Sequence, residues 1–346
     1  MKTRVCRLYA QNDIRIETDV IGDPGPGEVL LRMGFGGICG SDLHYYQDGG
    51  FGPIRVKEPI ILGHEVSGTV AALGSGVSHL QVGMKVAFNP SRACGRCRYC
   101  QEGMPRHCLE MRFSGSAMRT PHEQGGFRQH MIVQAEQCIP LRNATSLAHA
   151  ACAEPLSVAL HARSRAGDMT GKQVLVTGAG PIGSLCVAAA REGGAKHIVA
   201  TDIQDATLEV ARQMGADETL NMVRNGGALE PWYADKGQFD VVFECSAAPS
   251  AMRDAMSAVR PCGTIVQVGV TGDQTIPLNV LVGKEISLRG THRFDQEFEL
   301  AVSLIDSGRI DVGPIITGRY PLDKALEAFE AAADRSRSVK VQLALE

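Results

Sequence analysis

The sequence lacks any apolar run long enough to predict a membrane-spanning helix. Its longest uncharged stretch, residues 174–190, contains three glycines and a proline, whereas a spanning helix needs about 20 predominantly apolar residues. Residues 1–13 have no apolar centre and therefore predict no signal peptide. The chain also lacks an excess of charge of one sign, because its net charge is −3. We therefore expect neither nucleic acid nor a membrane surface as a partner.

The cysteines do not form the even, dispersed set that a disulfide framework requires. There are 11 of them, an odd number, and four lie between residues 94 and 108. This grouping is typical of metal binding in a reducing compartment, so we expect a cytoplasmic protein. A chain of 346 residues with 44% hydrophobic and 21% charged side chains is that of a globular protein of about two domains.

Residues 36–65 collect candidate metal ligands among glycines. Cys39 and His64 are candidate zinc ligands, because a thiolate and a neutral imidazole suit a borderline-soft cation. Glu65 is either a third ligand or a group that orients the site. Ser41 and His44 follow Cys39 closely, where they can pass a proton out of a buried metal site. The residues from Gly63 onward fit the pattern G-H-E-x(2)-G-x(5)-G-x(2)-V.

This pattern resembles that of the zinc-dependent medium-chain alcohol and polyol dehydrogenases. Either ligand alone would more simply be an ordinary buried residue, but the whole pattern favours the family. The alternating, glycine-rich sequence up to Gly83 predicts only a β-rich region; the resemblance implies a GroES-like β-barrel there. It also implies that the chain returns to this first domain near residue 286. We therefore expect an α/β protein with a GroES-like catalytic domain (1–147 and 286–346) and a doubly wound Rossmann domain (148–285).

The cysteine group predicts a second zinc site with a structural role. Cys94, Cys97 and Cys100 are three residues apart, and Cys108 follows eight later. Four thiolates can close a tetrahedron around one zinc and tie down a loop that has no core of its own. Redox use of a C-x-x-C pair is the alternative, which the repeated spacing and the fourth cysteine disfavour. We expect neighbouring guanidinium groups to favour the thiolates, and family members carry such a lobe at about residues 92–110.

Glu154 is a carboxylate in the otherwise apolar stretch 148–160. Burying it costs several kcal/mol unless it meets a cation or strong donors. In the polyol branch a glutamate within E-P-L-S-V-x-x-H-A lies at or beside the metal, where the alcohol dehydrogenase branch has a cysteine. The resemblance therefore places Glu154 at the catalytic zinc, and whether it or Glu65 is the direct ligand stays open. The simpler alternative is a carboxylate that starts a helix before Pro155.

A dinucleotide-binding motif opens the second domain. A buried strand is followed by a glycine loop and a helix, and the next strand ends in Asp202. The loop should admit a pyrophosphate at the helix N-terminus. Asp202 should take the ribose hydroxyls and repel a 2′-phosphate, which predicts NAD over NADP; the alternative is a turn-forming aspartate. The later segments predict a parallel sheet of about six strands. The expected cofactor residues are Gly178, Gly180, Pro181, Ile182, Gly183, Asp202 and, near the nicotinamide, Val268, Gly269 and Val270.

The resemblance also implies a mechanism. Zinc held by Cys39, His64 and a glutamate lowers the pKa of the substrate hydroxyl, and NAD takes the hydride. The proton leaves through Ser41 and His44, and Tyr45 contacts the substrate. Arg293 matches the arginine of the polyol branch's aromatic-Arg-aromatic motif near the substrate, although His292 replaces its first aromatic residue. We expect two zinc ions per chain.

Residues 111–127 indicate the substrate. They resemble the L-idonate 5-dehydrogenase type, M-R-F-x-G-S-A-M-x-x-P-H-x-x-G-G-F, although Ser114 stands where that type often has an aromatic. Arg112, Arg119 and Arg293 are candidate partners of a carboxylate. We expect oxidation of L-idonate to 5-keto-D-gluconate, with sorbitol, xylitol or L-threonine as alternative substrates. A non-catalytic NAD(H) sensor is a distant alternative. The family implies a homo-oligomer, a tetramer or dimer.

Overall fold

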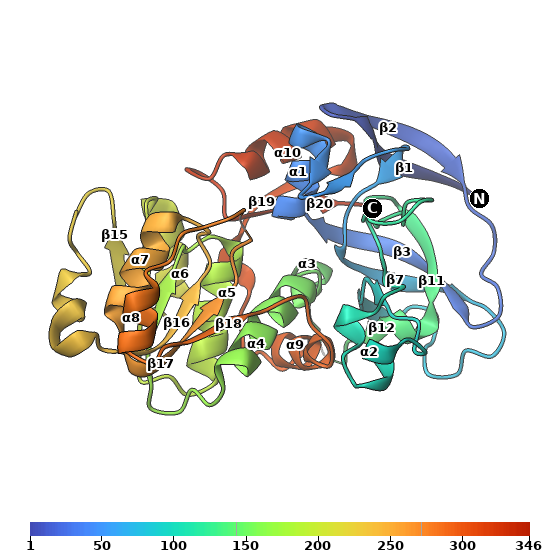
Figure 1. Cartoon of the computed structure of the whole chain (residues 1–346). Coiled ribbons are helices and arrows are strands. Elements are labelled where there is room, and N and C mark those ends of the chain that lie inside the picture. Colours follow the sequence, from blue (N-terminus) through green and yellow to red (C-terminus); the bar gives the residue numbers. More distant parts are fainter. Residues whose placement is uncertain (143, 271) are drawn as a thin grey trace.

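The computed structural model describes residues 1–142, 144–270 and 272–346. Two sheets dominate it, a parallel sheet flanked by helices and a larger, mostly antiparallel sheet that contains the last strand of the chain (Figure 1). No helix within these residues is long and apolar enough to cross a bilayer. The division of the chain at residues 147/148 and 285/286 stays a prediction.

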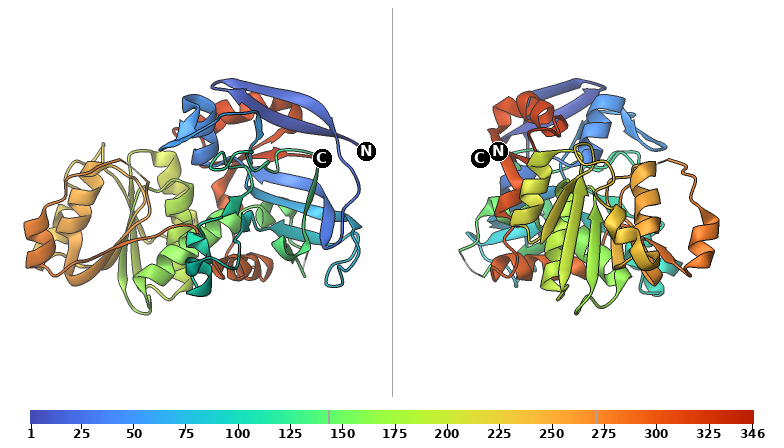
Figure 2. Two further views of the ribbon diagram at one scale, coloured as in Figure 1. Left: turned by 45° about the vertical axis from the view of Figure 1, so that its right-hand side comes forward. Right: turned by 90° about the vertical axis from the view of Figure 1, so that its left-hand side faces the viewer.

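The parallel sheet has six strands in the order β15-β14-β13-β16-β17-β18. Every neighbouring pair is parallel, as expected from the sequence. Figure 2 (right) shows this sheet with helices on both sides. The strands are β13 (Gln173–Thr177), β14 (His197–Asp202), β15 (Glu218–Asn221), β16 (Phe239–Glu244), β17 (Val259–Gln267) and β18 (Ser287–Gly290).

Alternate residues of these strands enter two different cores. Val174 and Val176 pack in the cluster that includes α4 (Ala153–Ala166), α5 (Pro181–Glu192) and α9 (Glu297–Asp306). Leu175, between them, packs on the other face with α7 (Pro249–Ala258). The period-2 alternation of a strand thus explains why β13 is apolar throughout, since both of its faces are covered. The remaining helices of this region are α6 (Asp205–Gln213) and α8 (Leu278–Gly283).

The second sheet has seven strands, six of them in the order β12-β8-β7-β3-β20-β19, with β11 also paired to β3. Its central strand β3 pairs with β7 on one side and with β20, close to the C-terminus, on the other. The strands are β3 (Glu28–Gly37), β7 (Glu65–Leu73), β8 (Lys85–Phe88), β11 (His130–Gln134), β12 (Cys138–Pro140), β19 (Ile316–Pro321) and β20 (Lys340–Ala344). The last strand of the chain therefore lies against the strand that leads to Cys39 (Figure 1).

Smaller elements complete this half of the molecule. A separate three-stranded sheet joins β1 (Lys2–Ala10), β2 (Asp13–Val20) and β6 (Ile60–Ile61). The helices are α1 (Gly40–Asp48), α2 (Arg98–Gln101), α3 (Leu147–Ala150) and α10 (Ala325–Ala333). The β-rich prediction for the first 83 residues missed α1.

The helix α1 begins directly after Cys39, its N-cap residue, and Asp42 closes its first turn. The Asp42 carboxylate accepts the backbone N–H of Cys39 at 3.0 Å, which satisfies a donor that the first turn would otherwise leave unpaired. Cys39 therefore occupies the N-cap position of the helix, with its backbone N–H held by Asp42.

Gly183 allows α5 to lie close to the glycine loop. A Cβ at this position would overlap the carbonyl oxygen of Gly178. We expect Gly183→Ala to destabilise the protein by at least about 1–3 kcal/mol and to weaken NADH binding, as measured by thermal unfolding and NADH fluorescence titration. Gly226→Ala is the control, since nothing lies within 4 Å of its Cβ position. Equal behaviour of the two variants would contradict this packing account.

Candidate active site

Three predicted ligands meet in one place. A sulfur of Cys39, a ring nitrogen of His64 and a carboxylate oxygen of Glu65 all lie within 4.8 Å of one another. They meet because Cys39 follows β3 and Glu65 begins β7, and these strands pair with Gly37 opposite Glu65. A Cβ at Gly37 would overlap the Glu65 carboxylate, so only glycine leaves room for this arrangement.

The donor set fits a zinc ion. Cys, His and Glu are the ligand types of three-ligand catalytic zinc sites. Glu65 Oε2 is buried and has no hydrogen-bond partner among the described residues, and a charged oxygen left in that state is costly unless a cation meets it. Burial lowers the pKa of His64, but the charges of Asp42 and Cys39 outweigh it and raise that pKa well above its ordinary value. The same negative potential attracts a cation.

Two buried residues that the sequence analysis missed hold the ligands in place. Asp42 Oδ1 lies 3.7 Å from His64 Nδ1, so Nε2 is the ring nitrogen left for a metal. Lys340, from the last strand, donates through Nζ to Glu65 Oε1 at 2.7 Å and to the carbonyl oxygen of Ile38 at 3.2 Å. The signal for Lys340 was a single charged residue within the apolar closing strand, whose partner no local pattern reveals.

Glu154 lies close to this group but does not belong to it. It is in the first turn of α4 and is buried. Burial and the charge of Glu65 raise its pKa to about 7, although His64 acts in the opposite direction. The three-residue cluster contains Glu65 and not Glu154, so the geometry favours Glu65 as the carboxylate ligand. A direct ligand role for Glu154 gains no support from this cluster.

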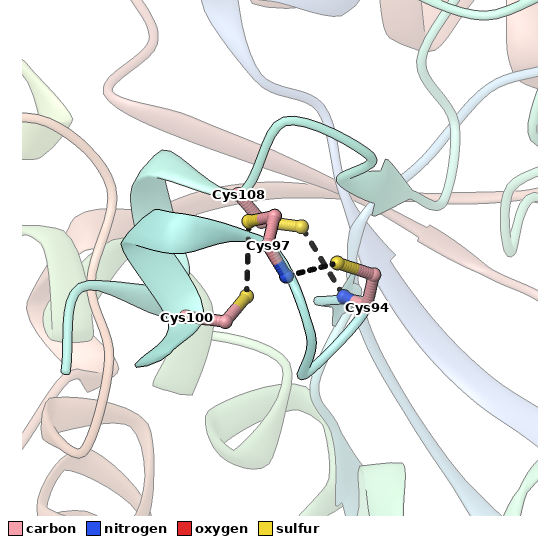
Figure 3. A group of neighbouring side chains, drawn as sticks. All are labelled: Cys94, Cys97, Cys100 and Cys108. Atoms are coloured by element: carbon pink, nitrogen blue, oxygen red, sulfur yellow. Dashed lines mark hydrogen bonds between the residues drawn. The ribbon is translucent and has the colours of Figure 1, made fainter. Parts of the chain in front are cut away.

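The four predicted structural ligands also converge. Figure 3 shows the side chains of Cys94, Cys97, Cys100 and Cys108, whose sulfurs all lie within 4.8 Å of one another. Backbone N–H groups lower the pKa of Cys97 to about 6 and also lower that of Cys94. The largest causes are backbone donors rather than the arginine side chains expected from the sequence. Arg96 pairs instead with Glu110, and Arg106 with Asp295.

A cavity of about 340 Å³ lies at the carboxyl ends of the parallel strands. It is lined by Gly178, Gly180 and Asp202, among others. The Asp202 carboxylate accepts backbone N–H groups of Ala179 at 2.7 Å and Gln204 at 2.9 Å, which fixes its position beside the glycine loop. This is where ligands bind in doubly wound sheets.

A neighbouring cavity of about 480 Å³ connects the glycine loop to the metal ligands. Its lining includes the remaining predicted cofactor residues, Pro181, Ile182, Gly183, Val268, Gly269 and Val270, together with Cys39, Ser41, His44 and Glu65. Arg335, which the sequence analysis missed, lines both cavities. Its guanidinium lies within 4 Å of the Cβ positions of Gly40 and Gly180, where it can meet a pyrophosphate.

A third cavity, of about 450 Å³, reaches the other side of the metal ligands. Ser41 and His64 line it together with Tyr45, Phe113 and Arg293. The Phe113 ring contacts both His64 and Arg293. Its centroid is 5.4 Å from that of the His64 ring and 4.6 Å from the Arg293 Cζ atom. Ala117 N donates to the Tyr45 hydroxyl at 3.3 Å, which orients that group.

Two of the three arginines expected to bind a substrate carboxylate lie outside the third cavity. Arg112 pairs with Glu123, and Arg119 donates to the carbonyl oxygens of Met111 and Leu109. Neither lines the third cavity, whereas Arg106 and His107 do. The alternation of β10 (Arg112–Phe113) explains the difference, because it points Phe113 into the cavity and Arg112 away from it.

We expect Lys340→Met to destabilise the chelator-treated protein by about 3 kcal/mol, because it leaves Glu65 buried without its cationic partner. The loss should be smaller in zinc-loaded protein. Adding Glu65→Gln to the Lys340→Met variant should recover part of the lost stability. Thermal unfolding of the chelator-treated and the zinc-loaded protein measures both effects. If the double variant is no more stable than Lys340→Met, the Glu65–Lys340 pair is not what the lysine stabilises.

Comparison with known proteins agrees with this geometry. A family model described as "Alcohol dehydrogenase GroES-like domain" matches residues 25–143, and one described as "Zinc-binding dehydrogenase" matches residues 181–307. "L-idonate 5-dehydrogenase (NAD(P)(+))" of Escherichia coli K12 is 42% identical over 344 residues, 99% of each chain. "Sorbitol dehydrogenase" of Gallus gallus is 37% identical over 341 residues, 97% of this chain and 94% of its own.

Comparison with solved structures supports the same family. The crystal structure of L-idonate 5-dehydrogenase from E. coli K-12 matches with a TM-score of 0.93 at 41% identity, covering 99% of this chain and 98% of that one. The predicted fold, the dehydrogenase activity, zinc and a nicotinamide dinucleotide are thereby confirmed. The E. coli relative's name covers both dinucleotides, so the preference for NAD stays a prediction. The chain belongs to the zinc-binding medium-chain alcohol and polyol dehydrogenases, with a GroES-like and a Rossmann-like domain.

Proposed function

We propose that this dehydrogenase oxidises L-idonate at carbon 5, reversibly, to 5-keto-D-gluconate, with NAD as the hydride acceptor. One observation supports the acidic substrate most directly: the cavity that contains His64 also contains Arg293. Among the described residues no carboxylate lies within ion-pair distance of Arg293, whose guanidinium packs on Phe113. A cation without an acidic partner, in the cavity of the metal ligands, is suited to a carboxylate. The 42% identical relative named for L-idonate adds to this support.

The residues around the cavities have distinct proposed roles. Cys39, His64 and Glu65 would hold zinc, which as a Lewis acid lowers the pKa of a substrate hydroxyl. Ser41, shared by the cofactor and substrate cavities, would relay the hydroxyl proton, accepting it while it passes its own proton on toward His44. His44 pairs with Asp48 at 2.8 Å and has 52% of its side chain exposed, so it can release that proton to water.

Tyr45, Glu154 and Arg293 orient the substrate in this proposal. The Tyr45 hydroxyl is held by Ala117 N and lies 3.4 Å from the Ser116 hydroxyl. Glu154, whose pKa burial raises to about 7, offers its carboxyl group as a hydrogen-bond partner beside the metal ligands.

The preference for NAD rests on Asp202. Its carboxylate is fixed at the edge of the first cavity, where it would accept ribose hydroxyls and repel a 2′-phosphate. Arg224 lies in the turn after β15, near this end of the sheet. It is paired with Asp205 at 2.5 Å. This pairing reduces its availability to a 2′-phosphate.

A neutral polyol is the second candidate, favoured by the relatives named sorbitol dehydrogenase. Xylitol and L-threonine remain further alternatives. A non-catalytic NAD(H) sensor fits less well, because the three ligands of the catalytic site are present and converge. We also propose a cytoplasmic location, since all 11 cysteines are free thiols. The tetramer stays a prediction.

We expect Cys39→Ala to lower kcat by at least about a thousandfold, because it removes a ligand of the Lewis acid. Metal analysis should show one zinc per chain in place of two, with little change in the circular dichroism spectrum. Cys262→Ser is the control, since Cys262 is exposed and outside both ligand groups. Substantial activity in Cys39→Ala would refute the proposed metal centre.

A substrate panel tests the proposed reaction directly. We expect kcat/KM with NAD to be highest for L-idonate, ahead of sorbitol, xylitol and L-threonine, and lower with NADP for each substrate. Product analysis should show the ketone at carbon 5. A clear preference for sorbitol would contradict the substrate proposal, and a higher kcat/KM with NADP would contradict the role given to Asp202.

A further inference from the structure

Two histidines meet at the end of the substrate cavity that lies beside the cysteine lobe. The rings of His107 and His292 stack with their centroids 5.8 Å apart and an interplanar angle of 20°. His107 immediately precedes Cys108, while His292 lies after β18, far away in the sequence. Both line the cavity together with Arg106 and Arg293. Four nitrogen-bearing side chains thus gather at one place, from two separate parts of the chain.

Two of the acidic residues near these side chains already have partners, and a third, Glu154, acts on Arg293 through its charge without forming an ion pair with it. Asp295 accepts from the backbone N–H and the guanidinium of Arg106. Glu297 Oε1 lies 2.9 Å from His161 Nδ1. Arg293 has no carboxylate within ion-pair distance among the described residues. This end of the cavity therefore has one cation that a ligand can pair with, flanked by the two stacked imidazoles.

His292 provides a hydrogen-bond donor without adding a fixed charge. Partial burial, and after it the charges of Arg293 and His107, lower its pKa to about 4. Near neutral pH its ring is therefore uncharged and carries one N–H and one acceptor nitrogen. A phenyl ring at this position would provide no N–H donor.

We propose that His292, supported by its stack on His107, donates to the carboxylate of the substrate beside Arg293 and thereby makes the site prefer an acid to a neutral polyol. This inference rests on the proposed function and assigns a specificity residue to it. A carboxylate accepts several hydrogen bonds and is charged, so it gains from Arg293 and the histidine together. A terminal CH2OH group gains no charge interaction there.

The experiment compares two substrates that differ only in the group at carbon 1, a carboxylate or a CH2OH. L-Iditol carries CH2OH where L-idonate carries its carboxylate. The measured quantity is the ratio of kcat/KM for L-idonate to kcat/KM for L-iditol, with NAD. His292→Phe should lower this ratio about tenfold or more, the effect of one lost charge-assisted hydrogen bond. His292→Gln, which keeps a donor at a similar reach, should retain most of the ratio.

His197→Phe is the matched control, because His197 stacks on Trp232 in the other half of the molecule. It should leave the ratio unchanged. If His292→Phe does not fold, His292→Ala takes its place with the same expected loss.

Three outcomes would overturn the inference. An unchanged ratio in His292→Phe and His292→Ala would refute it while leaving the proposed function intact. If that unchanged ratio comes with an equal loss of kcat/KM for both substrates, His292 only maintains the cavity; if both values are unchanged, His292 has no role in the reaction. A wild-type enzyme that prefers L-iditol would refute the proposed function, and this inference with it.

Discussion

The buried pair of Glu65 and Lys340 is the interaction on which the rest of this structure depends. Glu65 offers one oxygen to Lys340 and keeps the other buried without a hydrogen-bond partner among the described residues. A carboxylate oxygen of Glu65 lies within 4.8 Å of ligand atoms of Cys39 and His64. Lys340 comes from β20 and Glu65 from β7, and both strands pair with β3. The pairing of β3 with β7 brings the catalytic ligands together, and the C-terminal strand adds the lysine that pairs with Glu65, so both ends of the catalytic domain contribute to the site.

The two metal centres differ in a way that explains their roles. Four cysteines can close a tetrahedron and leave no position for a substrate, whereas Cys39, His64 and Glu65 leave one open. The cysteine lobe also takes part in the substrate cavity, because it contributes Arg106 and His107 and is docked to Asp295. The lobe has a small core of its own, formed by Cys108, Met111 and Phe113. It is thereby linked to recognition of the substrate.

Local patterns were enough to predict much of the fold and of the ligand set. The strand, glycine loop, helix and Asp202 predicted the cofactor site, and cysteine spacing predicted the group at Cys94. Contacts between residues far apart in the sequence could not be predicted: Asp42 meets His64, Lys340 meets Glu65, and Arg335 reaches the glycine loop only through packing. Arg112 and Arg119 illustrate the same limit, since both are in the right segment but point away from the cavity. The choice between Glu65 and Glu154 likewise required the arrangement in space.

The most direct measurement of the central claim is an anomalous difference map from crystals of the protein, collected at the zinc absorption edge. We predict two peaks per chain, one among the four cysteine sulfurs and one in contact with Cys39, His64 and the Glu65 oxygen that Lys340 does not bind. A map with the cysteine peak alone, or with a second zinc that does not touch Glu65, would contradict the account.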